Sequence, residues 1–249
     1  MGTALITGAS SGLGREFARQ IAWRGHDVVL VARDRERLEA LADELELTYR
    51  VRAEVLPADL SLSDDLARVC ERLTSVDDPV GLLVNNAGYT VHGRFLRTEI
   101  RDQRSLEAVM VGAVMELSHA GARAMLVRGR GAILNVSSVA SLTTAGTYSA
   151  HKAWVRTFTE GLAAELDGKG VTATALCPGF VHTEFHKRAN IDETRIPEIA
   201  WLDVRYVVRA ALEDVNKGRV ISTPSFRYKV VSAVLRILPR RVIRGIQHR

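Results

Sequence analysis

Short apolar segments and longer amphipathic segments alternate from one end of the chain to the other. The apolar runs are typical of strands buried on both faces of a sheet, and the amphipathic segments carry apolar residues at helical spacing with charges opposite. The predicted strands are 3–7, 27–32, 51–56, 80–85, 132–137, 171–176 and 219–222. The predicted helices are 13–23, 35–47, 64–73, 105–127, 148–166 and 203–215.

This alternation predicts an α/β fold, with about seven mostly parallel strands in one doubly wound sheet and helices on both faces. The crossovers should be right-handed. Ligands bind such sheets beyond the carboxyl ends of the strands, where the strand order reverses. Because the chain has no internal repeat, linker or low-complexity tract, we expect one domain whose functional residues directly follow its strands.

Composition excludes several classes of protein. Of the 249 residues, 47% are hydrophobic and 25% are charged, unlike collagen or a disordered chain. Two cysteines, Cys70 and Cys177, cannot build a disulfide framework and fit no CxxC metal pattern, so we expect thiols in a reducing, cytoplasmic compartment. No apolar run reaches the ~18 residues of a spanning helix. The first strand begins too near Met1 to leave room for a signal peptide.

The net charge of +5 is unevenly distributed. Residues 215–249 contain nine Lys or Arg and no Asp or Glu, whereas residues 1–214 hold 25 basic and 29 acidic residues and carry −4. A basic end of this kind does not by itself predict a nucleic-acid partner, and we expect none.

The basic end also has an amphipathic pattern. A basic amphipathic segment of this kind fits the surface of an anionic membrane. It fits equally well against the body of the protein or against a partner subunit. Phe226, Val230, Val234, Ile237 and Leu238 recur at helical spacing, with Lys229, Ser232 and Arg236 on the other side.

A glycine-rich turn follows the first strand. It reads Thr7-Gly8-Ala9-Ser10-Ser11-Gly12-Leu13-Gly14 and leads into a helix. Glycines there let the backbone approach a pyrophosphate, and the helix N-terminus offers free N–H groups and a positive dipole end. The alternative is an ordinary tight turn between strand and helix.

Arg33 follows the second strand, where an NAD site usually carries an acidic residue for the ribose hydroxyls. A guanidinium suits a 2′-phosphate, so the sequence favours NADP, with NAD also possible. The neighbouring Asp34 weakens this interpretation because it could pair with Arg33.

Polar and small residues follow two further strands. Asp59, before Leu60, could accept a hydrogen bond from the adenine amino group; otherwise it caps a helix, a role that Ser61 or Ser63 fits better. The run 85–88, Asn-Asn-Ala-Gly, leaves room for a flat ribose–adenine edge. Its asparagines can tie neighbouring strand ends together.

Ser138, Tyr148 and Lys152 are the candidate catalytic residues. Residues four apart in a helix point to one face, so Tyr148 and Lys152 can act together. A nearby ammonium should lower the pKa of the phenol, which is ordinarily ~10, and so suit it to acid–base catalysis. Ser138 could hold a carbonyl oxygen. Taken alone, a Tyr and a Lys at this spacing are common.

Together these motifs resemble the classical short-chain dehydrogenases/reductases, over about residues 2–224. The resemblance implies a Rossmann-type fold and nicotinamide-dependent hydride transfer. It implies a nucleotide-binding and catalytic domain over residues 1–224 and a basic tail over 225–249. Tyr148 would be the acid–base, Lys152 would lower its pKa and bind ribose, and Ser138 would orient substrate. The residues expected to bind the cofactor are Gly8, Ser10, Ser11, Gly12, Leu13, Gly14, Arg33, Asp59, Leu60, Asn86, Ala87, Gly88, Tyr148, Lys152, Pro178, Gly179, Val181 and Thr183.

Two features depart from that family's pattern. The family's fourth catalytic residue, an Asn that helps to hold a proton-relay water, aligns with Met110, and methionine cannot form the same hydrogen bonds. The interval from Ser138 to Tyr148 is three residues shorter than the commonest one, so Ser137 could take the serine role if the loop shifts. An active but slow enzyme, or one with a narrow substrate range, is the expectation.

Other chemistries fit less well. His182 and His186 are four apart, but no HExxH pattern joins them, and we expect no metal. In the family that the chain resembles, helices equivalent to 105–127 and 148–166 commonly pair across a dimer, often within a tetramer.

The sequence therefore predicts an NADP(H)-preferring oxidoreductase that interconverts a ketone or aldehyde and an alcohol. A hydrophobic or lipid-like substrate is compatible with the tail. The alternative is a sensor or regulatory protein of the same fold that binds NADP with little turnover, which Met110 favours and the intact Ser138, Tyr148 and Lys152 disfavour.

Overall fold

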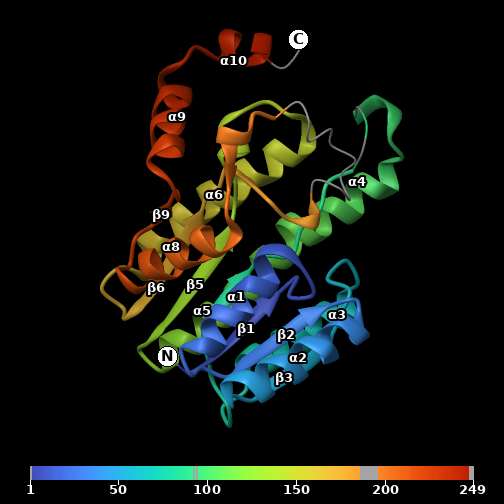
Figure 1. Cartoon of the computed structure of the whole chain (residues 1–249), viewed down its shortest axis with the longest axis vertical. Helices are drawn as coiled ribbons and strands as arrows, with labels where there is room; N and C mark the ends of the chain where they lie inside the picture. The colour runs from blue at the N-terminus through green and yellow to red at the C-terminus, as the bar shows by residue number, and fades with distance from the viewer. Residues whose placement is uncertain (1, 92, 94, 186–195, 247–249) are drawn as a thin grey trace.

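Seven parallel strands form the central sheet of the computed structural model, which describes residues 2–91, 93, 95–185 and 196–246 (Figure 1). Their order is β3-β2-β1-β4-β5-β6-β9. The strand order reverses between β1 and β4, so the carboxyl ends of these two strands flank the crevice where such sheets bind ligands. The strands are β1 (Thr3–Thr7), β2 (Val28–Ala32), β3 (Ala53–Pro57), β4 (Val80–Asn85), β5 (Gly131–Val136), β6 (Val171–Leu176) and β9 (Ile221–Ser222).

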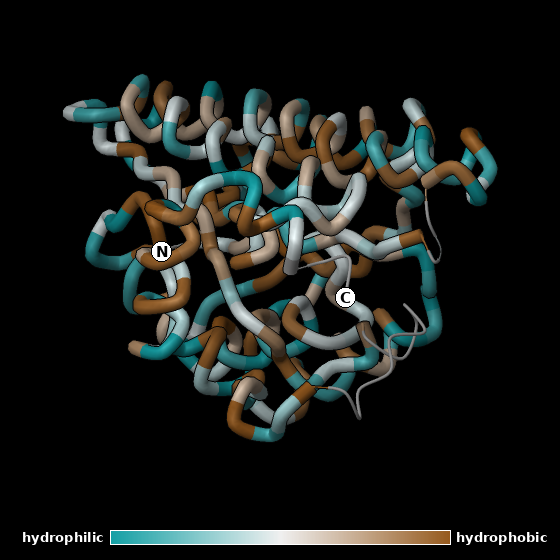
Figure 2. Tube along the Cα trace, turned by 90° about the horizontal axis from the view of Figure 1, so that it is seen from above, coloured by the Kyte–Doolittle hydropathy of each residue, from teal (hydrophilic) through white to brown (hydrophobic). Residues whose placement is uncertain are grey.

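Helices cover both faces of this sheet (Figure 2). One core cluster packs α1 (Gly12–Trp23), α2 (Arg35–Tyr49) and α8 (Val204–Asn216) against side chains such as Ile6. The other packs α3 (Ser63–Thr74), α5 (Ala113–Val127) and the end of α6 (Gly146–Leu166) against side chains such as Leu5. Successive residues of a strand point to opposite faces, so the continuous apolar runs seen in the sequence fill two cores at once.

The predicted architecture is confirmed, with different boundaries at several elements. The third strand lies at Ala53–Pro57 rather than 51–56, and the last is reduced to Ile221–Ser222. The long helix predicted at 105–127 begins earlier, at α4 (Ile100–Glu107), and passes through a π-helical turn, η2 (Ala108–Gly112), into α5. An apolar periodicity of 3.6 residues does not reveal a single widened turn.

Two short elements near the site were not predicted. A second, two-stranded parallel sheet joins β7 (Phe180–Val181) to β8 (Trp201–Leu202). Strands of two residues are too short to show any alternation. Among the residues that the structure describes, the remaining short elements are the 3₁₀ turns η1 (Phe95–Arg97), η3 (Val139–Leu142) and η5 (Glu198–Ala200).

The chain ends in two helices, α9 (Phe226–Ile237) and α10 (Arg240–Ile246). Figure 1 shows them projecting beyond α6 at the end of the molecule opposite the N-terminus. The tail predicted from residue 225 is therefore helical, and its Tyr228 is buried in the core of the body. Within the described residues, no helix has the length and apolarity needed to cross a membrane.

Candidate active site

The glycine turn joins β1 to α1 in a backbone conformation that residues with a Cβ atom would disfavour. Gly8 and Gly12 have positive φ angles of 67° and 55°. A Cβ on Gly14 would lie 2.1 Å from the carbonyl oxygen of Gly8, so only glycine lets α1 approach the strand end so closely. The first turn of α1 carries no acidic side chain, which leaves its positive dipole end available to an anion.

Asn86 holds the ends of β1 and β4 together beside this turn. Its Nδ2 donates to the carbonyl oxygen of Thr7 at 2.9 Å, and the Thr7 hydroxyl accepts from the backbone N–H groups of Asn86 and Ala87. The neighbouring Asn85 is buried and donates to Ser118 and Asn135. The asparagines thus tie strand ends together, as the sequence analysis expected.

Arg33 and Asp59 face each other at the carboxyl ends of β2 and β3. A guanidinium nitrogen of Arg33 lies 4.0 Å from a carboxylate oxygen of Asp59, and the Arg33 side chain is 75% exposed. Asp34 does not compete for Arg33, because its side chain caps α2 by accepting from the Arg37 N–H and pairs with the Arg37 guanidinium at 3.3 Å. Arg33 therefore remains open to a further anion.

Asp59 is held by its own loop rather than acting as a helix cap. Its carboxylate accepts from the backbone N–H and the hydroxyl of Ser61. The N-cap of α3 is Leu62, so neither Ser61 nor Ser63 takes the capping role considered from the sequence. Leu60, also expected at the cofactor site, is buried in the core beneath this loop.

Ser138, Tyr148 and Lys152 converge beyond the carboxyl end of β5. Tyr148 and Lys152 lie on the first turns of α6, with the lysine nitrogen 5.8 Å from the centre of the tyrosine ring. The lysine nitrogen also donates to the Val136 carbonyl at 2.6 Å. The Ser138 hydroxyl lies beside the phenol of Tyr148, accepts from the Ala140 N–H at 3.1 Å and donates to the Pro178 carbonyl at 3.4 Å.

Ser137 is not available for the serine role. Its side chain is buried, and its hydroxyl donates to the backbone carbonyl of Lys152 at 2.7 Å. This bond fastens α6 to the end of β5, whereas Ser138 points to the phenol. Of the two serines, only Ser138 places its hydroxyl beside the phenol of Tyr148.

Burial moves the pKa values of the two titratable groups in opposite directions. Although Tyr148 as a residue is half-buried, burial of its phenol raises its pKa to about 12, and the hydrogen bond with Ser138 only partly opposes this. Burial lowers the pKa of Lys152 to about 8. The expectation that the lysine would depress the pKa of Tyr148 is therefore wrong for this structure, because the loss of solvent around the phenol outweighs the ammonium.

Met110 lies where the sequence analysis placed it, close to the lysine. It belongs to η2 and is fully buried. A methyl group built on Gly88 would lie 3.7 Å from both the Lys152 nitrogen and the Met110 Cγ. The thioether side chain thus stands in the immediate surroundings of the lysine, next to a widened helical turn of the kind often found at functional sites.

The segment after β6 folds back over the glycine turn. Pro178 and Gly179 follow the strand, Val181 is buried in β7, and the Thr183 side chain lies over Gly12, where a Cβ would come within 3.3 Å of it. Thr183 also accepts from the N–H of Phe185 at 3.3 Å. The structure therefore brings these residues to the same crevice as the glycine turn.

Tyr228 is a residue of this region that the sequence analysis missed. Its ring packs on Gly179 so closely that a Cβ there would lie 1.9 Å from the ring. Its hydroxyl accepts from the Phe180 N–H at 3.1 Å and donates to the Ala200 carbonyl at 2.7 Å. It lies some fifty residues further along the chain, so no local pattern could reveal the contact.

The histidines belong to other surroundings. His151 lines a small hollow with α4 residues such as Gln103 and Glu107, away from the phenol. His182 stacks on Trp201 with ring centres 4.3 Å apart, and His186 lies outside the described residues. Among those described, no three His, Cys, Asp or Glu residues are grouped to hold a metal ion.

Comparison with known proteins matches residues 2–194 to a family model described as short chain dehydrogenase. Galactitol 2-dehydrogenase (L-tagatose-forming) of Cereibacter sphaeroides is 32% identical over 245 residues, which cover 94% of this chain and 92% of the relative.

Solved structures of dehydrogenases are also similar to this chain. A short-chain dehydrogenase from Sphingobium yanoikuyae in complex with NADPH matches with a TM-score of 0.87 and 36% identity, covering 94% of this chain and 93% of that one. The bulky-bulky ketone specific alcohol dehydrogenase from Comamonas testosteroni matches with a TM-score of 0.82 and 32% identity over 96% of each chain.

Proposed function

This chain belongs to the short-chain dehydrogenase family, and on that premise we propose that it is an NADP(H)-preferring oxidoreductase that interconverts a ketone or aldehyde and the corresponding alcohol. The observation that carries the proposal is the convergence of Ser138, Tyr148 and Lys152 at the crevice that the glycine turn also borders.

The described residues fit a dinucleotide with a 2′-phosphate. The turn from Gly8 to Gly14 would receive the pyrophosphate at the N-terminus of α1, because its backbone has the required positive φ angles. Arg33 would bind the 2′-phosphate, and Asp59 beside it would accept from the adenine amino group. The lysine amine of Lys152 would bind the ribose near Asn86 and Gly88.

The protein's own residues provide the proton chemistry. When bound, the cofactor supplies or accepts the hydride at the carbonyl carbon. Tyr148, whose raised pKa keeps its phenol protonated at neutral pH, donates a proton to the carbonyl oxygen during reduction and takes it back during oxidation. Ser138 holds that oxygen by a hydrogen bond. The ammonium of Lys152 stabilises the phenolate left after proton donation.

The walls near Tyr148 favour a hydrophobic substrate. The ring of Phe185 lies 5.7 Å from that of Tyr148, and Phe180 packs against Trp201 at the same distance. Aromatic side chains here would exclude water from the reacting carbonyl and contact apolar substituents on it. The Comamonas protein, which is similar to this chain and is specific for bulky-bulky ketones, agrees with such walls.

A homodimer or homotetramer is the expected assembly. Trp154 and Phe158 stack 4.7 Å apart on α6 and are still half-buried, and Met115 of α5 is exposed. A second copy that covers these apolar side chains would bury them, as subunit contacts of this kind usually do.

A low-turnover NADP-binding sensor is the second candidate, and Met110 is the observation that favours it. The thioether beside Lys152 cannot hold a relay water in the way an asparagine can. The candidates differ in whether the phenol of Tyr148 is needed for more than binding.

The variant Tyr148→Phe separates these two functions. We expect it to lower kcat for NADPH-dependent reduction of a panel of ketones of graded chain length by about 10²–10⁴-fold, the usual worth of a positioned proton donor. NADPH affinity, followed by nucleotide fluorescence, should change by less than about threefold, because the loss of one hydroxyl contact is small against the remaining contacts. Tyr49→Phe, on α2 away from the site, is the matched control. Unchanged turnover in Tyr148→Phe would refute the catalytic role, and a wild type that binds NADPH but reduces no ketone would favour the sensor.

A further inference from the structure

Helix α9 turns an apolar face toward solvent. It packs on the body through Tyr228, Ser232 and the half-buried Leu235. The opposite side carries a stripe of apolar residues at positions i, i+4, i+8 and i+11, which share one face of a helix. Their exposed fractions are 79% for Phe226, 47% for Val230, 45% for Val234 and 82% for Ile237. A surface helix that packs on the body of a protein through one face normally carries polar residues on the opposite face.

Cations flank this stripe. At 100° per residue, Arg227 lies on one side of it, and Lys229 and Arg236 lie on the other. Helix α10 continues the basic surface beyond Pro239. The six basic residues of the two helices are all exposed, and within the described part of the chain no carboxylate is paired with any of them; they are Arg227, Lys229, Arg236, Arg240, Arg241 and Arg244.

We propose that this C-terminal helix pair, α9 and α10, docks on the surface of a bilayer that contains anionic phospholipids. The apolar stripe would enter the boundary between headgroups and acyl chains, and the flanking cations would stay at the headgroup phosphates, as long basic side chains do. Both features are needed, since an apolar face explains insertion and the one-sided positive charge explains the preference for an anionic surface.

Charge also argues against a second copy of this chain as the occupant. Two copies that met through this face would bring two clusters of six cations together without any acidic residue between residues 215 and 249 to offset them. An anionic bilayer offers the opposite sign. The body, residues 1–214, has a net charge of −4 and would be repelled, so the charge distribution also orients the molecule with its helix pair toward the membrane.

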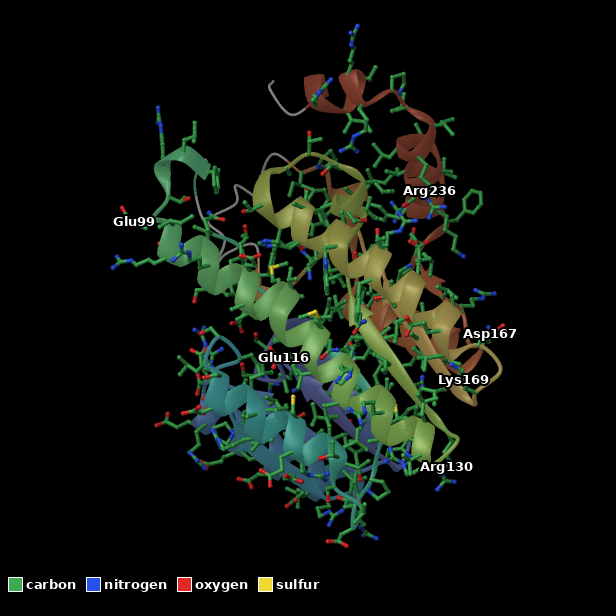
Figure 3. The ribbon with its side chains drawn as sticks, turned by 180° about the vertical axis from the view of Figure 1, so that it is seen from behind. Glu99, Glu116, Arg130, Asp167, Lys169 and Arg236 are labelled. Carbon is green, nitrogen blue, oxygen red and sulfur yellow. The ribbon has the colours of Figure 1, made fainter. Side chains whose placement is uncertain are left out.

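The helix pair adjoins the catalytic loop. Tyr228 bonds to Phe180 and Ala200, and a guanidinium nitrogen of Arg240 donates to the Leu142 carbonyl in η3, four residues after Ser138. Figure 3 shows Arg236 on α9 well above Arg130 and Lys169, which stand just before the amino ends of β5 and β6. Docking would therefore bring the substrate side of the sheet, and not the amino ends of the strands, toward the bilayer.

Vesicle co-sedimentation of the full chain tests whether the C-terminal helix pair docks on an anionic bilayer. We expect the protein to sediment with vesicles of phosphatidylcholine mixed with phosphatidylglycerol, to bind phosphatidylcholine alone at least about tenfold more weakly, and to be released by high salt. The assay reads binding alone, so its outcome is independent of whether the proposed reduction takes place. Absence of binding to the anionic vesicles would overturn the proposal.

Matched variants assign the binding to the helix pair. Phe226→Ser with Val230→Ser should lower partition about tenfold or more, whereas Leu47→Ser with Val76→Ser, apolar residues elsewhere that are at least as exposed, should leave it unchanged. Lys229→Gln, Arg236→Gln and Arg241→Gln together should lower it about a hundredfold, at about fivefold per cation. Arg123→Gln, Arg130→Gln and Lys169→Gln are the charge-matched control.

Two results would overturn the assignment. If the test and control variants lost vesicle binding equally, binding would depend on the overall charge of the protein and not on this face of α9. The other result is that the wild type does not bind vesicles and that Phe226→Ser/Val230→Ser has a smaller sedimentation coefficient than the wild type. This would mean that a second copy covers the stripe.

Discussion

Lys152 is a buried ammonium that donates a hydrogen bond to a backbone carbonyl, and its surroundings decide how it titrates. The side chain is 6% exposed, its nitrogen donates to the Val136 carbonyl, and Tyr148, Met110 and Gly88 surround it. Removal of water from a cation disfavours the charged form, which is why its pKa falls to about 8. At neutral pH the ammonium therefore persists at a cost in folding free energy.

The pH dependence of stability should report this cost. Since the pKa of Lys152 is lower in the folded protein than its ordinary value of 10.5, the unfolded chain binds more protons between pH 8 and 10.5. The free energy of unfolding should therefore rise with pH there, by about 2 kcal/mol between pH 7 and 9.5. Burial raises the pKa of Tyr148 to about 12, so that residue lowers stability only above about pH 10.

Urea unfolding of the wild type, Lys152→Met and Lys169→Met at the two pH values measures the effect. The difference between wild type and Lys152→Met isolates this lysine from the thiols of Cys70 and Cys177, whose pKa values are raised by burial. Lys169, which is exposed, should keep the wild-type response. If Lys152→Met gained stability with pH as much as the wild type does, the ammonium would not be the source.

Arg33 is the residue on which cofactor choice should depend. It stands free of Asp34 and adjacent to Asp59, at a point where a 2′-phosphate would meet its guanidinium. Arg33→Asp should lower kcat/KM for NADPH relative to NADH by about a hundredfold, because charge-assisted hydrogen bonds worth about 2–3 kcal/mol are replaced by repulsion. Steady-state kinetics with both cofactors measure the ratio, and Arg130→Asp is the control. An unchanged ratio would place the selectivity elsewhere.

At the scale of elements, the helix that carries Met110 is interrupted where it passes the site. Helix α4 gives way to the π turn η2 and then to α5, with the N–H of Ala113 bonded to the carbonyl of Ala108. A widened turn redirects backbone carbonyls toward neighbouring groups. Those carbonyls remain candidates to hold a relay water in place of the missing asparagine side chain.

Helix α9 contributes to the site through one tyrosine. The Tyr228 hydroxyl bridges Phe180 and Ala200, and so links the tail to β7 and to η5, the turn that leads into β8. Tyr228→Phe should lower the free energy of unfolding by about 1–3 kcal/mol, the cost of two partly buried backbone groups that lose this partner. It should also raise KM for the ketone, since Gly179 and Phe180 line the crevice.

Tyr206→Phe is the matched control for that variant. The Tyr206 hydroxyl accepts from the Ser225 N–H at 3.2 Å, but the residue is exposed and water can replace the bond. Thermal or urea unfolding and ketone kinetics of both variants measure the difference. If Tyr228→Phe lowered the free energy of unfolding no more than Tyr206→Phe does, the hydrogen bonds of Tyr228 to Phe180 and Ala200 would not be what holds α9 in place.

At the scale of the whole molecule, charge and chemistry are separated along one axis. The glycine turn, Arg33, Asp59 and the Ser138–Tyr148–Lys152 group all lie at the carboxyl ends of parallel strands, because every crossover returns the chain to the same side of the sheet. The basic helices lie beyond the same end, past η3. The net charge of the whole chain describes neither part.

Much of this arrangement was predictable because it follows from local rules. Strand and helix periodicities, the glycine turn and the spacing from Tyr148 to Lys152 each involve residues a few positions apart, and parallel strands bring their carboxyl ends together whatever the details. The turn at Gly8 and Gly12 has the positive φ angles that the glycines indicated. The boundaries and the two-residue strands were not predictable, because short elements are decided by neighbours distant in sequence.

The sequence by itself determined the doubly wound architecture, the dinucleotide turn and the set of candidate catalytic residues, since periodicity and local backbone chemistry specify these. Tertiary structure alone decided which serine faces Tyr148, because Ser137 is drawn to the Lys152 carbonyl. It decided the directions of the two pKa shifts, because burial is a property of the folded surroundings. It also decided which face of α9 is covered: Tyr228 fills the space over Gly179, and the apolar stripe is left facing outward.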